Sequence, residues 1–113
     1  MSERQVRDSL RDMLEAARRI LLYIERISFE QFREDYKTQD AVLRNLEVLG
    51  EAAKNVPDKF RKEYPDLPWT DMARTRDRLI HHYFGVNLDV VWGIAKIELP
   101  DLVAKLETTL EDN

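Results

Sequence analysis

The chain of 113 residues contains no cysteine, which excludes disulfide bonds and thiolate metal sites. It has only 3 Gly and 4 Pro, and so few turn-forming residues favour a few long helices over many short strands. It also lacks a long uncharged run that could span a membrane, and its N-terminus lacks the apolar core of a signal peptide. We therefore expect a cytoplasmic protein that does not associate with a membrane.

Composition and charge narrow the class further. With 43% apolar and 35% charged residues, the chain has the balance of a globular protein, and its length predicts a single domain over residues 1–113. The net charge of -4 argues against a broad basic surface for nucleic acid. It leaves room for a local basic site at Arg74, Arg76 and Arg78, which only Asp71 and Asp77 counter nearby in sequence.

Apolar residues spaced by three and four predict a first helix over about 4–27. Ser28 then fits an N-cap, with Gln31 in capping-box register. It opens a second helical segment over about 29–36, with a bend or break near 37–38. The buried stripe predicted for the first helix consists of Val6, Leu10, Met13, Leu14, Ala17, Leu21 and Ile24.

A third apolar stripe, over 41–56, ends at Pro57. Gly50 lies inside it, where glycine costs a helix about 1 kcal/mol relative to alanine. We expect that this glycine permits a close approach between helices. Residues 57–64 are predicted to form a short helical turn.

A fourth helix is predicted to open at Trp69 or Thr70 and to end at Gly85, which suits a C-terminal cap. Asn87 is predicted to cap the last helix, and Pro100 inside that helix should kink it. Together these elements predict an all-α, antiparallel, up-and-down bundle of four to five helices. The expected core contacts of the fourth helix are Met72, Leu79, Ile80 and Phe84.

Residues 76–84 concentrate the chemistry and hold both histidines. His81 can move a proton near neutral pH. Arg76 keeps its charge and matches phosphate oxygens, and Tyr83 adds a hydroxyl and a stacking face. These are the components needed to act on a phosphate.

Helix geometry limits how these residues can meet. Residues five apart are separated by about 140° around an ideal helix, so Arg76 and His81 do not point at one spot, whereas Arg76 and Tyr83 lie within about 20° of each other. Either the helix unwinds near Gly85, or two chains share the site around a two-fold axis. We favour the two-fold axis, because one motif then supplies both an acid and a base.

Simpler explanations exist for each residue alone. A histidine near a helix C-terminus often compensates the helix dipole, and clustered arginines are often a solvated face. Metal binding is not expected, since the adjacent His81 and His82 point about 100° apart. No metal or other cofactor is predicted.

The order Arg76-x-x-x-x-His81-x-Tyr83 resembles the R-x4-H-x-Y signature of HEPN-domain proteins, specifically the HepT-like toxins of prokaryotic toxin–antitoxin pairs. The resemblance covers nearly the whole chain. It extends to Arg44-Asn45-Leu46-Glu47-Val48-Leu49-Gly50-Glu51-Ala52-Ala53-Lys54, to Pro68-Trp69, to Val90-Val91-Trp92 and to Leu99-Pro100-Asp101-Leu102.

The resemblance implies a homodimeric HEPN-like bundle that is a metal-independent ribonuclease, with tRNA as one candidate substrate. It implies a toxin of a type VII-like system, neutralised by a minimal nucleotidyltransferase antitoxin. Arg76 and His81 correspond to the family's catalytic pair, and Tyr83 to the tyrosine that receives AMP. Asp77 matches a position that is polar in the family. It could orient or screen Arg76, and Arg74 and Arg78 are further candidates for supporting roles.

Two other interpretations stay open. HEPN-like bundles also serve as noncatalytic nucleotide- or substrate-binding subunits of nucleotidyltransferases, and the acidic net charge suits that role. Alternatively, the chain is a structural bundle in which the motif is only a capped and solvated helix, because a shared fold does not by itself establish activity.

Overall fold

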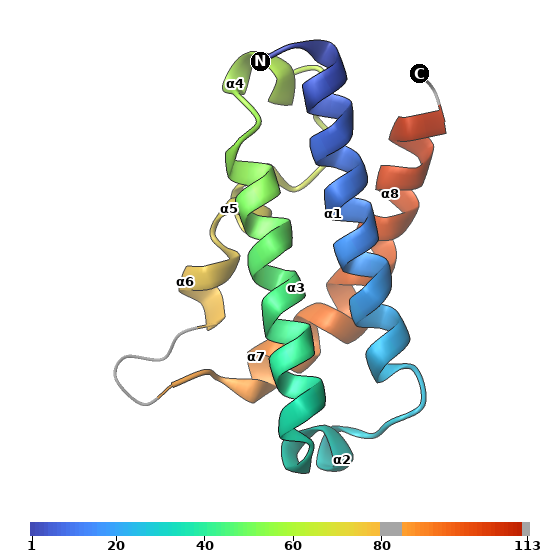
Figure 1. The fold of residues 1–113 in the computed structure, drawn as a ribbon, viewed down its shortest axis with the longest axis vertical. Coiled ribbons are helices and arrows are strands. Elements are labelled where there is room, and N and C mark those ends of the chain that lie inside the picture. Colours follow the sequence, from blue (N-terminus) through green and yellow to red (C-terminus); the bar gives the residue numbers. More distant parts are fainter. Residues whose placement is uncertain (80–84, 112–113) are drawn as a thin grey trace.

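Three long helices form the body of the molecule: α1 (Glu3–Ile24), α3 (Tyr36–Lys54) and α8 (Leu99–Glu111). They lie side by side, and α1 runs antiparallel to the other two (Figure 1). The computed structural model describes residues 1–79 and 85–111, with the backbone alone at Arg76. The prediction of an all-α bundle is confirmed.

Short helices join and flank this body: α2 (Phe29–Glu34), α4 (Asp58–Arg61), α5 (Trp69–Ala73), α6 (Thr75–Leu79) and α7 (Leu88–Gly93). Helix α2 closes the end of the bundle where α1 stops and α3 starts (Figure 1). Helices α5 and α6 pack beside α3, and α7 crosses the bundle on its way to α8 (Figure 1). The predicted short turn after Pro57 is α4.

Side-chain caps fix where the first helices begin. The predicted capping box at Ser28 is confirmed: its hydroxyl accepts the Gln31 N–H, and the Gln31 side chain accepts the Ser28 N–H. The break before α3 lies at Asp35, two residues earlier than the predicted 37–38. The reason is that the Asp35 carboxylate caps α3 by accepting from Thr38, and these hydrogen bonds lower the pKa of Asp35.

The core lies between the inner faces of the three long helices. All but one member of the predicted stripe of α1 are buried, and Leu21 is partly buried against the core. At the α2 end, Trp92 packs against Phe29 and Phe32, with ring centroids 5.7 and 5.2 Å apart. Burial of these apolar surfaces is the main force that holds the bundle together.

Gly50 is the point of closest approach between α3 and α5, as predicted. A Cβ atom at this position would lie 3.1 Å from the backbone oxygen of Met72 and 3.7 Å from the Cβ of Thr75. The first distance is shorter than ordinary van der Waals contact, so a Cβ atom at position 50 would require the Met72 carbonyl to shift by a few tenths of an ångström.

The predicted continuous fourth helix is wrong in its middle. It opens at Trp69 as expected, but it breaks at Arg74 into α5 and α6. The Thr75 hydroxyl donates to the carbonyl oxygens of Met72 and Asp71, which offers these groups an alternative to the helix ladder. Met72 and Leu79 are buried as predicted. The other two predicted core contacts, Ile80 and Phe84, lie outside the described residues.

The described part of α6 stops at Leu79, so the predicted helix end at Gly85 depends on residues outside the described ones and stays a prediction. Gly85 does adopt a φ of 91°, a conformation that glycine takes without steric cost.

The last helical segment is irregular just before Pro100, the residue predicted to kink it. Asn87 caps α7 by accepting the Val90 N–H. A π-helical turn, η1 (Ile94–Glu98), then joins α7 to α8, and the Leu99 N–H donates five residues back to Ile94. Proline lacks an N–H and its ring crowds the carbonyl four residues earlier, so the wider turn accommodates it.

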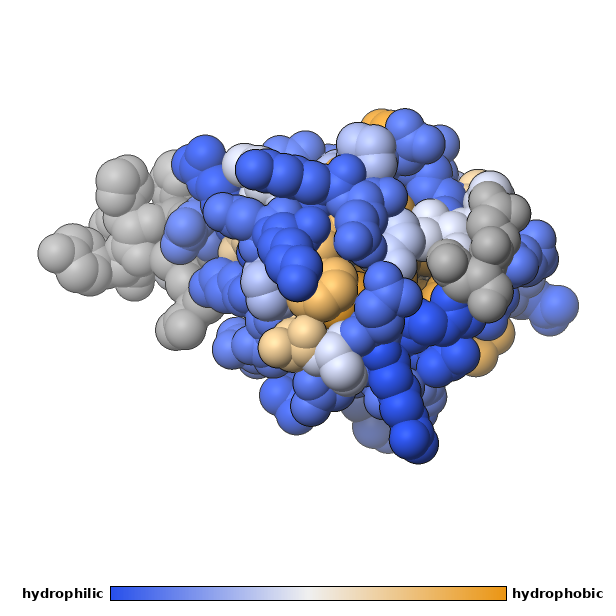
Figure 2. Space-filling view, turned by 90° about the horizontal axis from the view of Figure 1, so that it is seen from above, coloured by the Kyte–Doolittle hydropathy of each residue, from blue (hydrophilic) through white to orange (hydrophobic). Residues whose placement is uncertain are grey.

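The outer surface is largely hydrophilic. Seen from the end where α1 begins, the molecule shows mostly polar and charged residues with a few small hydrophobic areas between them (Figure 2). Among the described residues, no helix has both the length and the apolar character needed to cross a bilayer.

Substitution of the two helical glycines should affect stability in opposite directions. Gly50→Ala should lower the free energy of unfolding by about 1 kcal/mol, because overpacking against a backbone carbonyl outweighs the gain in helix propensity. Gly93 has a helical φ of -61°, and a Cβ atom added there would meet nothing within 4 Å. Gly93→Ala should therefore raise the free energy of unfolding by about 0.5–1 kcal/mol. Urea unfolding at an unchanged m-value measures both. A stabilised Gly50→Ala would contradict the close approach.

Candidate functional site

The sequence motif divides between described and undescribed residues. Arg76 is the second residue of α6, and its backbone position is given. His81 and Tyr83 lie outside the described residues, as does His82. The structure therefore places the arginine end of the motif on α6, beside α3 and α5, and does not test the predicted meeting of Arg76 with His81.

Helix α6 is held at its start by Thr75, which is only 3% exposed. Its hydroxyl oxygen lies 2.7 Å from the Met72 oxygen and 3.1 Å from the Asp71 oxygen. Because the same Met72 carbonyl faces Gly50, the joint between α5 and α6 is fixed against α3. The position of Arg76 follows directly from this joint.

The end of α6 is tied to the start of α7. The Asn87 N–H donates to the Leu79 oxygen over 2.9 Å, while the Asn87 side chain caps α7. Leu79, the last described residue before the histidines, is therefore held directly against the N-cap residue of α7.

The middle of α6 is tied to η1 by a bidentate ion pair. The two terminal nitrogens of Arg78 lie 2.9 and 2.6 Å from the two carboxylate oxygens of Glu98. These hydrogen bonds and the charge of Glu98 raise the pKa of Arg78, although burial opposes the shift. The sequence analysis missed Glu98, since its twenty-residue separation from Arg78 carries no local signal.

The remaining charged candidates lie at the surface. Arg74, at the break between α5 and α6, and Asp77, in the middle of α6, are both exposed. Arg74 thus stays available to a polyanion, whereas both terminal nitrogens of Arg78 are engaged. The predicted basic cluster is smaller than the sequence indicates.

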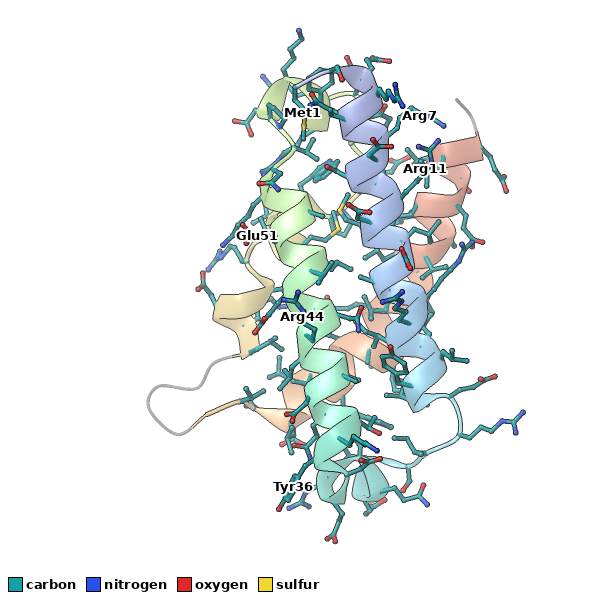
Figure 3. All side chains as sticks on the ribbon, in the orientation of Figure 1. Met1, Arg7, Arg11, Tyr36, Arg44 and Glu51 are labelled. Atoms are coloured by element: carbon teal, nitrogen blue, oxygen red, sulfur yellow. The ribbon has the colours of Figure 1, made fainter. Side chains whose placement is uncertain are left out.

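An open cleft along α3 adjoins this region and reaches Ala73 at the end of α5. Its charged lining comes from Asp12 of α1 and from four residues of α3: Arg44, Glu47, Glu51 and Lys54. Arg44 and Glu51 project from α3 on the side of the bundle that carries α5 and α6 (Figure 3). With both signs of charge present, the cleft does not form a uniform track for a polyanion.

Comparison with known proteins assigns the family. The model of the HepT-like ribonuclease family matches residues 13–109, which include all of α3, α5 and α6 and the complete motif from Arg76 to Tyr83. The chain therefore belongs to the HepT-like ribonuclease family, and the resemblance seen in the sequence is confirmed.

Individual relatives agree with this assignment. A protein of Methanocaldococcus jannaschii, provisionally named an RNase, is 44% identical over 112 residues, which cover 99% of this chain and 93% of the relative. A protein of Thermococcus cleftensis named Probable ribonuclease HepT is 47% identical over 105 residues, which cover 93% of this chain and 96% of the relative. No solved structure matches the chain significantly.

The joint at Thr75 can be tested without touching the motif. Thr75→Val keeps the shape of the side chain and removes the two hydrogen bonds, so it should lower the free energy of unfolding by about 1 kcal/mol. Thr75→Ser keeps the hydroxyl and serves as the control for the lost methyl group. Urea unfolding compares the two variants, and a Val variant as stable as the parent would show that the hydroxyl does not hold the joint.

Proposed function

We propose that this chain is a ribonuclease that cleaves RNA phosphodiester bonds without a metal, with Arg76 and His81 as its catalytic residues. The observation that carries the proposal is the family match over residues 13–109, because that range contains the whole R-x4-H-x-Y signature. The two relatives described above, named for ribonuclease activity, match over nearly their full length and support it.

The chemistry needs only what RNA and these side chains supply. The 2′-oxygen attacks the adjacent phosphorus as its proton passes to a histidine, and the bond to the 5′-oxygen breaks as that oxygen receives a proton from a second histidine. The products are a 2′,3′-cyclic phosphate and a 5′-hydroxyl. Arg76 stabilises the negative charge that builds on the phosphoryl oxygens in the transition state.

This mechanism favours a homodimer. One chain offers a single motif histidine at position 81, while the reaction uses a base and an acid. Two chains related by a two-fold axis would place two copies of His81 and of Arg76 in one cleft.

The same family membership suggests how the activity is controlled. We propose that the chain is the toxin of a toxin–antitoxin pair, with tRNA a candidate target, and that a small nucleotidyltransferase transfers AMP to the Tyr83 hydroxyl. AMP would place bulk and negative charge two residues from His81, and like charge would repel the RNA phosphate. Silencing would then act at the site itself.

Replacement of the catalytic pair gives the first test. His81→Ala and Arg76→Ala should each slow RNA cleavage at least about 100-fold while the protein stays folded. Cleavage by the parent should persist in EDTA and leave cyclic phosphate ends, measured on labelled RNA. The matched controls are His82→Ala, which removes the neighbouring imidazole, and Arg26→Ala, which removes one exposed surface charge.

Three outcomes would decide against the proposal. If His81→Ala cleaves as fast as the parent, the mechanism is wrong. If the parent loses activity in EDTA, the reaction needs a metal. If the parent binds nucleotide tightly and cleaves no RNA, the chain is a binding subunit of a nucleotidyltransferase.

The regulatory proposal has its own test. Tyr83→Phe should cleave RNA like the parent but gain no AMP when incubated with ATP and a minimal nucleotidyltransferase that modifies the parent. Intact-mass measurement detects the adduct. Tyr36→Phe is the control, because Tyr36 is 75% exposed and would take AMP if exposure alone selected the acceptor. An adduct that persists in Tyr83→Phe would place the modification elsewhere.

A further inference from the structure

Helix α6 depends on its neighbours for its orientation. Its described part, Thr75–Leu79, has five residues, whereas an isolated helix needs roughly 12–15 residues to be stable in water. Its direction and its rotation about its axis therefore depend on contacts with its neighbours. This matters because α6 carries Arg76, which the proposed function places at the reacting phosphate.

Two of these contacts lie at the ends of α6. Thr75 binds the end of α5, and Leu79 accepts from Asn87. Between them, Arg78 reaches across to Glu98 with two hydrogen bonds of 2.9 and 2.6 Å. Paired, coplanar hydrogen bonds restrict direction as well as distance, so this contact controls how far α6 is rotated.

The ion pair is screened from water on its inner side. Arg78 and Glu98 border a small pocket, partly open to solvent, whose other walls include Leu46, Met72 and Ile94. Their side chains are 31% and 42% exposed. An ion pair with an apolar wall behind it is less weakened by solvent than an ion pair on an open surface. The pair between Arg78 and Glu98 is therefore suited to hold α6 in position.

The π turn determines where Glu98 points. Glu98 is the last residue of η1, just before α8. Each residue added to a helix turns the following positions by about 100°. Without the wider turn that precedes Pro100, the carboxylate would face a different direction relative to α7 and could not meet Arg78.

We propose that Glu98 is a positioning residue of the ribonuclease site, which holds α6, and with it Arg76, through its bidentate contact with Arg78. Positions 76 and 78 are about 200° apart around a helix axis, so rotation of α6 about its axis would move both together. The inference rests on the proposed function. It assigns Arg78 to the support of the site and not to direct contact with RNA.

A double-mutant cycle tests this assignment. Glu98→Gln and Arg78→Gln should each lower kcat about 10- to 100-fold, the loss expected from misplacing a catalytic group by about 1 Å, with KM changed less than about twofold. The double variant should be no slower than either single variant, because both break the same contact. Single-turnover cleavage of labelled RNA gives these rates.

A contact between Arg78 and RNA predicts a different pattern. Arg78→Gln would then raise KM, and Glu98→Gln would leave cleavage intact or lower KM by freeing the arginine. Either result would overturn the inference. Additive losses in the double variant would also overturn it, since they mean that the two residues act separately.

Glu107→Gln is the matched control for a purely structural effect. Glu107 also lies on the C-terminal helical segment and pairs with an arginine, Arg18 of α1, over 2.6 Å, with its side chain 43% exposed. Its loss should leave kcat within about twofold of the parent, because a surface pair between α8 and α1 contributes little and does not touch α6. If Glu107→Gln slows cleavage as much as Glu98→Gln, the effect is general destabilisation and the inference fails.

Hydrogen exchange adds a local readout. Exchange at the Asn87 N–H, which donates to Leu79, should speed up in Glu98→Gln and stay unchanged in Glu107→Gln. Unchanged exchange in Glu98→Gln would contradict the proposal that the ion pair between Arg78 and Glu98 holds α6.

If the parent cleaves no RNA, the proposed function fails and the role of Glu98 falls with it. If the parent cleaves and His81→Ala does not, but Glu98→Gln cleaves at the full rate, only this inference fails.

Discussion

Close packing between α3 and the junction of α5 and α6 is the constraint on which the rest of the structure depends. Gly50 lets the Met72 carbonyl approach to a distance tighter than most Cβ contacts, and the Thr75 hydroxyl donates to the same carbonyl. Helix α6 then begins at a fixed point on the bundle. The arginine of the family signature sits one residue further on.

Family membership and local geometry support each other here. The HepT-like family match covers the scaffold helices as well as the motif, so the resemblance extends beyond a short pattern. The structure adds how the scaffold serves the motif: α3 supplies a surface, α5 supplies an anchored end, and η1 supplies a carboxylate. None of these contributions belongs to the R-x4-H-x-Y signature itself.

The long helices were predictable because their signals are local. The apolar period of α1 and the capping box at Ser28 depend on residues three or four apart, which sequence inspection detects. The helix break at Arg74 was missed, because it depends on the Thr75 hydroxyl and on the approach of α3. The partner of Arg78 was missed for a similar reason: Glu98 becomes its neighbour only after the chain folds back.

For the motif itself, the sequence supplied residue types and the family supplied roles. The position of Arg76 on α6 agrees with the predicted helix, whereas the two-fold arrangement of His81 stays a prediction. Helical periodicity could indicate only that Arg76 and His81 do not share a face. It could not show which neighbouring elements support them.

The π turn before Pro100 lies between α7 and α8, which otherwise form one continuous helix. It changes the direction around the helix axis in which the buried face points. An unbroken α-helix presents one stripe, whose direction is fixed along its entire length. The extra residue in η1 lets α7 face α6 while α8 faces α1. One continuous segment can thus pack against the core through α8 and support α6 through α7. A single straight helix would have to make both contacts with the same face.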